Sequence, residues 1–346
     1  MSSKIEQKEN TPDISTIGES KIAELCPYCK GKNFVKRGTR NNRYQVVQLY
    51  LCKNEECART FTAQDVKGKH FPLNVVIESM SYYNLGFSLE ETCRIIEKKF
   101  NALLPEVDKK KLSPDDFIAP TPATLSSWIN EYSSLCRYER MRPYAIKMCK
   151  PQETVEVVTM AHRQLYRFRY HRPKTTLMLT EFRNRNLGRL KEYLNAVSSE
   201  TPHQYFAEGE RMSDIRSKFS TADMIVRSKT NYANRLAAFV LQTVSENKMR
   251  HEALQRFFIA NDSCTVATEV PVYIRKEDVE YMENVLKFKV IGEDGIKFKR
   301  DTAKSTAKSR HGDGKLPKLL TGHIDLIQIR NGQVHIMDYK PNASKE

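Results

Sequence analysis

The chain has 346 residues, with 57 Lys and Arg against 42 Asp and Glu, and a formal net charge of +15. This length suffices for two or three domains with cores of their own, and so large a basic excess favours a polyanionic partner, because cations laid on phosphates release counterions. No apolar run approaches the roughly 20 residues of a membrane span, and the polar first residues lack the apolar core of a signal peptide, which excludes a membrane partner and predicts a cytoplasmic protein.

Residues 1–21 are rich in Ser, Lys, Glu and Thr and are predicted to form a disordered tail. Residues 22–66 then carry two pairs of cysteines, Cys26 with Cys29 and Cys52 with Cys57. Four thiolates at this spacing complete a tetrahedral Zn²⁺ site with no open position, which stabilises a domain too small to fold by apolar burial alone. The alternative is four unrelated buried cysteines.

The stretch Cys52-Lys-Asn-Glu-Glu-Cys-Ala-Arg-Thr-Phe-Thr62, which follows the first cysteine pair, resembles the zinc ribbon that opens some insertion-sequence transposases. The resemblance implies a module that binds DNA. Arg37 and Arg40, among the basic residues of this segment, suit contact with phosphates. Simple exposure to solvent is the alternative for both.

Residues 67–140 are predicted to form a helix-turn-helix-like DNA-binding module. Ser88-Leu-Glu-Glu91 is a capping box, and Thr121-Pro122 begins a second helix. The apolar face of this second helix consists of Leu125, Trp128, Ile129 and Tyr132. The other face is small and polar and consists of Ala123, Thr124, Ser126, Ser127 and Asn130. Such a helix suits insertion into a major groove and resembles the recognition helix of transposases and resolvases. An ordinary amphipathic helix in a small bundle is the alternative.

Residues 141–228 mix basic, aromatic and polar groups without a recognisable motif, and we interpret them as a linker or helical region. Between about residues 230 and 259, apolar residues recur at helical spacing. Strands are predicted at Cys264–Ile274 and as a pair at 323–329 and 334–340.

The dipeptide Asn331-Gly332 is the strongest two-residue signal for a β-hairpin. It places Arg330 opposite Gln333, and therefore Asp325 opposite Asp338, with Lys340 on the same face. Opposed carboxylates repel unless a divalent cation bridges them or one takes up a proton. This arrangement favours metal-assisted phosphodiester hydrolysis, in which the carboxylates bind Mg²⁺ or Mn²⁺ and the lysine orients or helps deprotonate the attacking water. The alternative is that these are ordinary surface strands, which often carry Asp and Lys residues at their ends.

Gly322-x-x-Asp325 followed by Asp338-Tyr-Lys340 resembles the PD-(D/E)XK nuclease superfamily, particularly its RecB-like branch, over about residues 230–340. The resemblance implies that His251 is a third metal ligand and that the backbone carbonyl of Tyr339 adds a further one. Glu269 falls where some relatives place an acidic residue on a strand. The superfamily core continues past the lysine into a helix and a strand, whereas the sequence ends at Glu346, so the resemblance implies a truncated core.

These patterns predict an α+β multidomain protein with a small β zinc ribbon, a helix-turn-helix-like module and, in residues 229–346, an α/β PD-(D/E)XK-like core. The predicted function is a nucleoid-associated, metal-dependent deoxyribonuclease with structural zinc and catalytic Mg²⁺ or Mn²⁺; a homo-oligomer is left open. One alternative is a non-catalytic, transposase-derived DNA-binding regulator. A DDE-type transposase is less favoured, because the Tyr166–His171 region supplies no carboxylate for such a triad.

Overall fold

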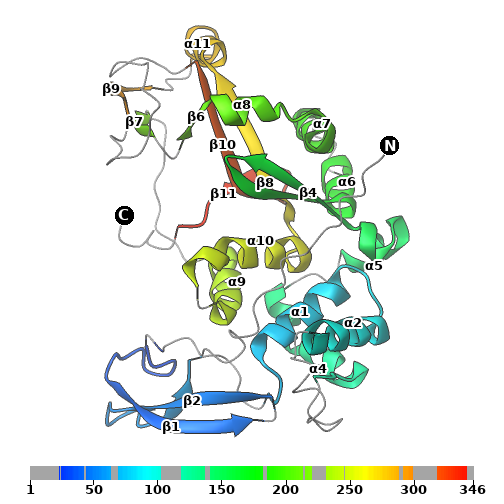
Figure 1. The fold of residues 1–346 in the computed structure, drawn as a ribbon, viewed down its shortest axis with the longest axis vertical. Coiled ribbons are helices and arrows are strands. Elements are labelled where there is room, and N and C mark those ends of the chain that lie inside the picture. Colours follow the sequence, from blue (N-terminus) through cyan, green and yellow to red (C-terminus); the bar gives the residue numbers. More distant parts are fainter. Residues whose placement is uncertain are drawn as a thin grey trace. The chain divides into compact units, whose positions relative to one another are not determined.

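The structure is a computed structural model, which describes residues 23, 25–42, 44–63, 69–102, 118–136, 141–181, 185–212, 215–219, 231–244, 246–287, 291–298 and 318–340. Helices and strands are mixed, and the chain divides into two compact units (Figure 1). The first unit comprises residues 1–147 and 231–263, and the second comprises residues 148–230 and 264–346. None of the helices in the described ranges is both long and apolar enough to cross a membrane.

The first unit begins with a small antiparallel sheet of three strands in the order β1-β2-β3. Its strands are β1 (Phe34–Asn42), β2 (Gln45–Cys52) and β3 (Thr60–Thr62). Three aromatic rings form its centre: the Phe34 ring centroid lies 5.6 Å from that of Tyr50 and 5.4 Å from that of Phe61. Cys26 and Cys52 are buried beside these rings, so the apolar core of the sheet is continuous with the cysteine pairs.

The rest of the first unit is helical. Its helices are α1 (Leu73–Asn84), α2 (Leu89–Ala102), α4 (Pro122–Cys136), α5 (Arg142–Met148, at the boundary of the units), α9 (Tyr232–Val240) and α10 (Arg250–Asn261). The predicted capping box of α2 is confirmed: the Glu91 N–H donates to the Ser88 hydroxyl at 3.1 Å, and the Ser88 N–H donates to the Glu91 carboxylate at 3.0 Å. At the start of α4, the Thr124 N–H donates to the Thr121 hydroxyl at 3.2 Å.

The region predicted as helical, about residues 230–259, consists of two α-helices separated by a break. After α9 the chain forms two 3₁₀ turns, Leu241–Thr243 and Asn247–Met249, before α10 begins. Between them Val244 is extended (φ −120°, ψ 111°) and buried, so helical spacing here reflects burial across a break and not one helix. Glu78 of α1 ties the neighbouring helices together through ion pairs with Lys99 of α2 (3.0 Å) and Arg256 of α10 (3.2 Å).

The second unit is built on a six-stranded sheet with the path β11-β10-β8-β5-β4, in which the short β6 pairs with β10. Its strands are β4 (Val155–His162), β5 (Gln164–His171), β6 (Glu210–Arg211), β8 (Thr265–Arg275), β10 (Leu319–Arg330) and β11 (Gln333–Met337). Strands β7 (Ile215–Phe219) and β9 (Ile291–Phe298) form a separate pair. All neighbours on the path are antiparallel, whereas β6 runs parallel to β10.

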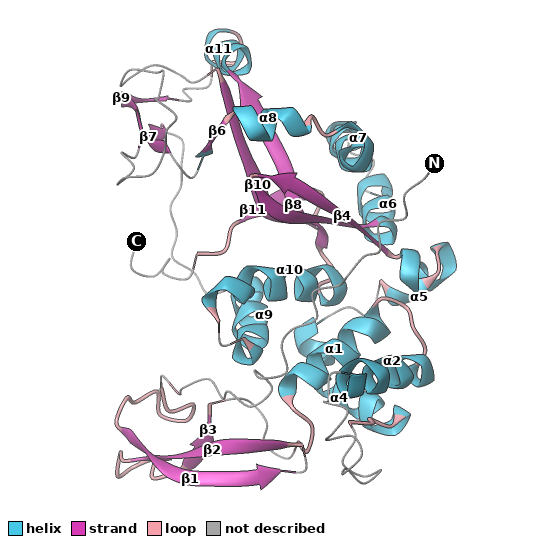
Figure 2. Ribbon diagram, in the orientation of Figure 1, coloured by secondary structure: helices cyan, strands magenta, loops and turns pink. Residues whose placement is uncertain are grey.

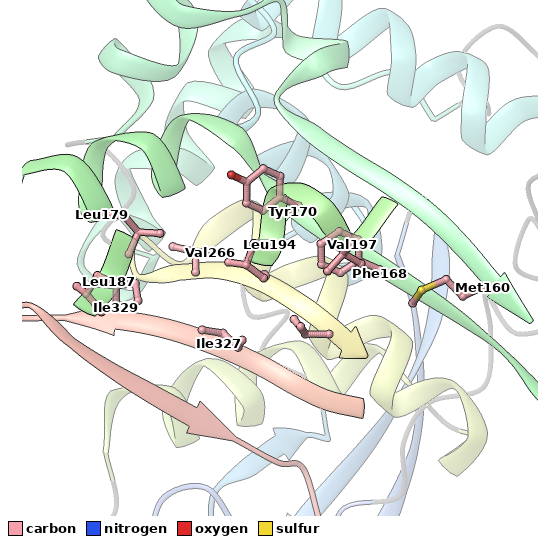
Figure 3. Packing of buried hydrophobic residues seen from close by; sticks show 12 residues of the cluster. Met160, Phe168, Tyr170, Leu179, Leu187, Leu194, Val197, Val266, Ile327 and Ile329 are labelled. Carbon is pink, nitrogen blue, oxygen red and sulfur yellow. The ribbon is translucent and has the colours of Figure 1, made fainter. Parts of the chain in front are cut away.

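Helices accompany this sheet along its length (Figure 2). They are α6 (Arg172–Glu181), α7 (Arg185–Glu200), α8 (His203–Glu208) and α11 (Lys276–Asn284), and a 3₁₀ turn, Pro151–Glu153, precedes β4. Side chains of α6 and α7 meet the sheet in the main core, where Leu194 of α7 lies with Phe168 of β5 and Val266 of β8 (Figure 3). Alternate residues of β5 face this core because side chains along a strand alternate between faces.

The division into units differs from the predicted domains. Within residues 141–228, expected as a linker or helical region, β4 and β5 form a hairpin whose Arg169 and Tyr170 pair with Thr268 and Ala267 of β8. Conversely, the predicted domain 229–346 is divided, because residues 231–263 belong to the first unit and residues 264–346 to the second.

Candidate functional site

The four predicted zinc ligands lie together. The Sγ atoms of Cys26, Cys29, Cys52 and Cys57 all lie within 4.8 Å of one another. Cys26 Sγ is 3.8 Å from Cys57 Sγ, and Cys29 Sγ is 3.5 Å from Cys52 Sγ. A tetrahedral site with Zn–S bonds of about 2.3 Å separates its sulfurs by roughly 3.8 Å. The cluster therefore fits a metal ion such as zinc, with every coordination position filled by sulfur.

Two tight backbone turns position these sulfur atoms. In the first turn the Lys30 N–H donates to the Cys26 carbonyl at 2.9 Å, and in the second the Ala58 N–H donates to the Asn54 carbonyl at 2.8 Å. Lys30 (φ 59°) and Ala58 (φ 43°) adopt left-handed backbone conformations, which close each loop soon after its cysteine. Left-handed residues that are not glycine are uncommon, and they persist where the surrounding structure requires them.

The electrostatics of the cluster differ from thiol to thiol. Burial raises the pKa of Cys26, but hydrogen bonds from the backbone N–H groups of Cys29 and Tyr28 outweigh this effect and hold the pKa at about 7. The Asn54 N–H lowers the pKa of Cys52, yet burial and the neighbouring sulfurs raise it to about 12. Because a cation favours the thiolate form, bound metal would release protons from this cluster.

The predicted phosphate contacts of the ribbon are on β1. Arg37 and Arg40 are both exposed, and the Arg37 guanidinium donates to the Thr60 hydroxyl of β3 at 2.8 Å. Both side chains are therefore accessible to a polyanion, and that of Arg37 is held against the small sheet.

Helix α4 separates its two predicted faces. On the apolar face, Leu125, Trp128 and Tyr132 are buried and Ile129 is half-buried. On the opposite face, the exposed residues are Ala123, Ser127 and Asn130, and the half-buried residues are Thr124 and Ser126. The Thr124 hydroxyl lies 2.9 Å from that of Thr121, so this side chain takes part in capping the helix.

The acidic hairpin has the predicted register. Arg330 pairs with Gln333, and the ladder runs back to the pair Leu326–Met337, next to Asp325 and Asp338. Asn331 (φ 51°) and Gly332 (φ 73°) both have positive φ, as a type I′ turn requires. Strand β11 ends at Met337, however, so the predicted strand to residue 340 is too long and Asp338 follows the ladder.

A hydrogen bond from the backbone explains where β11 ends. The Tyr339 N–H donates to Oδ2 of Asp325 at 2.8 Å, which draws the chain after Met337 onto a side chain of β10. Asp325 is buried, with 9% of its surface exposed, whereas the side chains of Asp338 and Lys340 are 54% and 57% exposed. One carboxyl group is thus fixed in the sheet, and its neighbour faces solvent.

Asp325, Asp338 and Lys340 form one cluster. The Lys340 Nζ atom lies 2.9 Å from Asp338 Oδ2. Burial raises the pKa of Asp338, and the carboxyl of Asp325, within hydrogen-bonding reach, raises it further, while Lys340 opposes the rise. The raised pKa thus reflects burial first and, in addition, the unfavourable proximity of a second carboxyl group.

Glu269 faces the same position from the other side of β10. The pairs Ile324–Val270 and Leu326–Thr268 flank Asp325 and Glu269 and place them opposite each other. Glu269 has a left-handed backbone (φ 52°) in the middle of β8, where an extended residue is the rule. Asp325 therefore lies between a carboxyl-bearing residue on β8 and another at the end of β11.

The predicted third ligand lies elsewhere in the chain. His251 is a half-buried residue in the first turn of α10, in the first unit, whereas both aspartates belong to the second. In the part of the chain that the structure describes, only the four cysteines form a group of three or more His, Cys, Asp or Glu with all ligand atoms within 4.8 Å.

Sequence analysis missed a chain of three histidines in the second unit. Nδ1 of His162 lies 2.9 Å from Nε2 of His323, and Nε2 of His162 lies 2.8 Å from Nδ1 of His203. The three residues come from β4, β10 and α8, so no local pattern links them. Burial lowers the pKa of His162 to about 4 and that of His323 to about 3, which leaves both rings neutral at pH 7.

Aromatic and basic side chains surround these histidines. The ring of Tyr166 on β5 stacks on that of His323 with a centroid separation of 3.6 Å, and Phe206 of α8 stacks on His162 at 3.9 Å. The Tyr166 hydroxyl accepts a hydrogen bond of 2.6 Å from the guanidinium of Arg211 on β6. The alternation of aromatic and basic residues from Tyr166 to His171 was a usable sign of a strand, but it was not recognised.

The chain was compared with protein-family models, curated proteins and solved structures, and none of them matches it.

Proposed function

We propose that this chain is a DNA-binding, metal-dependent nuclease that hydrolyses phosphodiester bonds at the cluster of Asp325, Asp338 and Lys340. The observation that carries the proposal is the adjacency of the two carboxyl groups, with the lysine 2.9 Å from Asp338. Like charges held this close destabilise a fold, and a divalent cation would offset their repulsion.

Donor chemistry supports Mg²⁺ or Mn²⁺ at this cluster. Both are bound by carboxylate oxygens and keep several waters, so a buried carboxylate beside an exposed one leaves room for a phosphate oxygen. A bound cation would supply Lewis-acid stabilisation of the phosphate charge and would make water easier to deprotonate. Asp325 and Asp338 would hold it, Glu269 and the Tyr339 carbonyl are further candidate ligands, and His251 stays a prediction.

The ion pair with Asp338 suggests what Lys340 does. An ammonium group beside a carboxylate keeps its proton and offers only donors. We therefore propose that Lys340 orients the attacking water or stabilises charge on the phosphate, and that it does not act as the base. The Asp338 carboxylate could take up a proton, because its pKa is raised.

The first unit would position this site on DNA. A cysteine cluster that fits zinc would stabilise the small sheet that carries Arg37 and Arg40. The exposed side chains of Ser127 and Asn130 on α4 suit contacts with base edges, because hydroxyl and amide groups both donate and accept hydrogen bonds.

The test is a cleavage assay with the full chain on single- and double-stranded DNA, with Mg²⁺, Mn²⁺ or chelator. We expect divalent-dependent cleavage that Asp338→Ala or Lys340→Ala abolishes while DNA binding is retained. Asp278→Ala, which removes a half-buried carboxylate on α11, is the matched control and should cleave like the parent. Equal cleavage by the parent and both site variants would refute the catalytic proposal.

A second candidate function is a non-catalytic DNA-binding protein, in which the acidic hairpin is only a scaffold. It is favoured by the finding that, among the described residues, only the cysteines bring three or more metal-ligating atoms all within 4.8 Å of one another. This candidate predicts that the chain binds DNA with equal affinity with and without added Mn²⁺ and never cleaves it.

A further inference from the structure

The second unit contains a guanidinium group that strand β6 positions beside β10. Arg211 is half-buried on β6, and its NH2 group donates to the Tyr166 hydroxyl at 2.6 Å. Within the described part of the chain, no carboxylate forms an ion pair with it. A half-buried cation without an anionic partner has lost part of its hydration, and the electrostatic attraction of a bound anion would offset the free-energy cost of that loss.

Arg211 is held in a defined place on the sheet. Strand β6 runs parallel to β10 with Arg211 opposite Thr321. The Tyr166 ring that receives its hydrogen bond is stacked on His323, so the guanidinium is positioned against rings from β5 and β10. An arginine positioned in this way loses less side-chain entropy when it binds a ligand than a free one does.

Arg211 lies on the same face of the sheet as the carboxylate cluster. His323 and Asp325 are two residues apart on β10 and therefore point to the same face. Arg211 reaches the ring stacked on His323, and its charge lowers the pKa of that histidine. The four residue steps of strand from Thr321 to Asp325 span about 13 Å, or roughly four nucleotides of one DNA strand at about 3.4 Å each.

A second guanidinium group lies close to the start of β6. Arg163, at the tip of the β4–β5 hairpin, donates to the backbone carbonyls of Ala207 (2.9 Å) and Gly209 (3.1 Å) and to no carboxylate in the described residues. Among the described residues, the acidic residues closest to Arg211 in sequence are Glu208, exposed at the end of α8, and Glu210. Glu210 points to the opposite face of β6 from Arg211, because successive residues of a strand alternate.

We propose that Arg211 binds a backbone phosphate of the nucleic-acid strand whose scissile bond lies at Asp325 and Asp338. This inference rests on the proposed nuclease function and adds a substrate-binding residue to it. A guanidinium group suits a phosphate because its planar donors match two phosphate oxygens, and the Tyr166 hydroxyl leaves most of those donors available.

The test uses the full chain and a short single-stranded oligonucleotide, with cleavage in Mn²⁺ measured at several salt concentrations. For Arg211→Gln we expect KM to rise roughly tenfold with kcat little changed. The slope of log(kcat/KM) against log[salt] should become shallower by about 0.7, because one phosphate contact is lost. A purely structural defect would not change that slope.

Arg189→Gln is the matched control, since it removes an exposed guanidinium from α7, and it should leave KM and the salt slope unchanged. Arg211→Lys keeps the charge and guards against misfolding of the glutamine variant. The lysine variant should keep the parental slope, and a slope as shallow as that of the glutamine variant would overturn the proposal. So would a parental KM and slope in Arg211→Gln. A parent chain that does not cleave would instead refute the nuclease function, and this inference with it.

Discussion

The backbone N–H of Tyr339 donates a hydrogen bond of 2.8 Å to the buried carboxylate of Asp325. This bond joins the end of β11 to the side chain of β10 around which the candidate site is built. It occupies one lone pair of the Asp325 carboxylate. It also brings Asp338, the preceding residue, beside Asp325, so one backbone contact accounts both for the end of the strand and for the adjacency of the carboxyl groups.

Asp338→Asn should change the pH dependence of stability in the metal-free protein. The pKa of Asp338 in the folded chain is raised above its ordinary value of 3.8. At pH values between the ordinary pKa and the raised pKa, the folded chain therefore binds more protons than the unfolded chain. Stability contributed by this group is therefore lost as pH rises through that window. The parent should lose stability relative to the asparagine variant as pH rises above about 4, measured by urea unfolding in chelator.

Asp278→Asn is the control, because the stability that this carboxylate contributes should change with pH in the opposite direction. Arg275 lowers the pKa of Asp278, so its stabilising contribution is present above the unfolded pKa and is lost as pH falls. Mn²⁺ at neutral pH should then raise the melting temperature of the parent and of the Asp278 variant, but not that of Asp338→Asn. Parallel pH profiles for parent and Asp338→Asn would show that the two carboxyl groups do not interact.

The hairpin register was accessible from sequence because it depends on a local signal. Asn331 and Gly332 tolerate the positive φ that a type I′ turn needs, and the pairing follows from the turn outward. The cysteine spacing and the caps of α2 and α4 are equally local. Each of these features is specified by residues close together in the chain.

Features that depend on distant residues were missed. The β4–β5 turn has Arg163 at φ 60°, a residue that does not usually signal a tight turn, so the hairpin was not recognised. His162, His203 and His323 meet only through the pairing and packing of three separate elements. The left-handed backbone at Glu269 has no sequence signature at all. Tertiary packing determines these features, and single-sequence patterns do not report it.

Loss of zinc should unfold the small sheet of the first unit. Cys52→Ser removes a buried ligand, and structural zinc sites contribute about 10–16 kcal/mol of apparent binding free energy at pH 7. We expect one zinc per parent chain and almost none in the variant by elemental analysis, with weakened DNA binding. Cys149→Ser, a half-buried thiol outside the cluster, should keep the metal. Full zinc occupancy in Cys52→Ser would contradict the four-sulfur site.

Helix α4 allows DNA contact to be separated from folding. Trp128 is buried, so Trp128→Ala should cost about 3–5 kcal/mol in the free energy of unfolding. Asn130 is exposed on the other face, so Asn130→Ala should change stability by no more than about 0.5 kcal/mol while weakening DNA binding roughly tenfold. Urea unfolding and a mobility-shift titration measure the two effects. Unchanged DNA affinity in a double Ser127→Ala, Asn130→Ala variant would remove α4 from the DNA-binding surface.

Glu269 offers a test that separates backbone strain from metal binding. A left-handed conformation costs a non-glycine residue about 1–2 kcal/mol, and glycine avoids this cost while losing about 0.5–1 kcal/mol of backbone entropy. Because Glu269 has φ 52°, Glu269→Gly should be at least as stable as Glu269→Ala in urea unfolding, the reverse of the order expected in an extended strand.

Both variants lack the carboxylate, and so does Glu269→Gln, which keeps the size of the side chain. If Glu269 helps to bind the cation, all three should show a smaller Mn²⁺-induced rise in melting temperature than the parent. A rise equal to that of the parent in Glu269→Gln would restrict the site to the two aspartates, because the glutamine variant alters charge and little else at this position opposite Asp325.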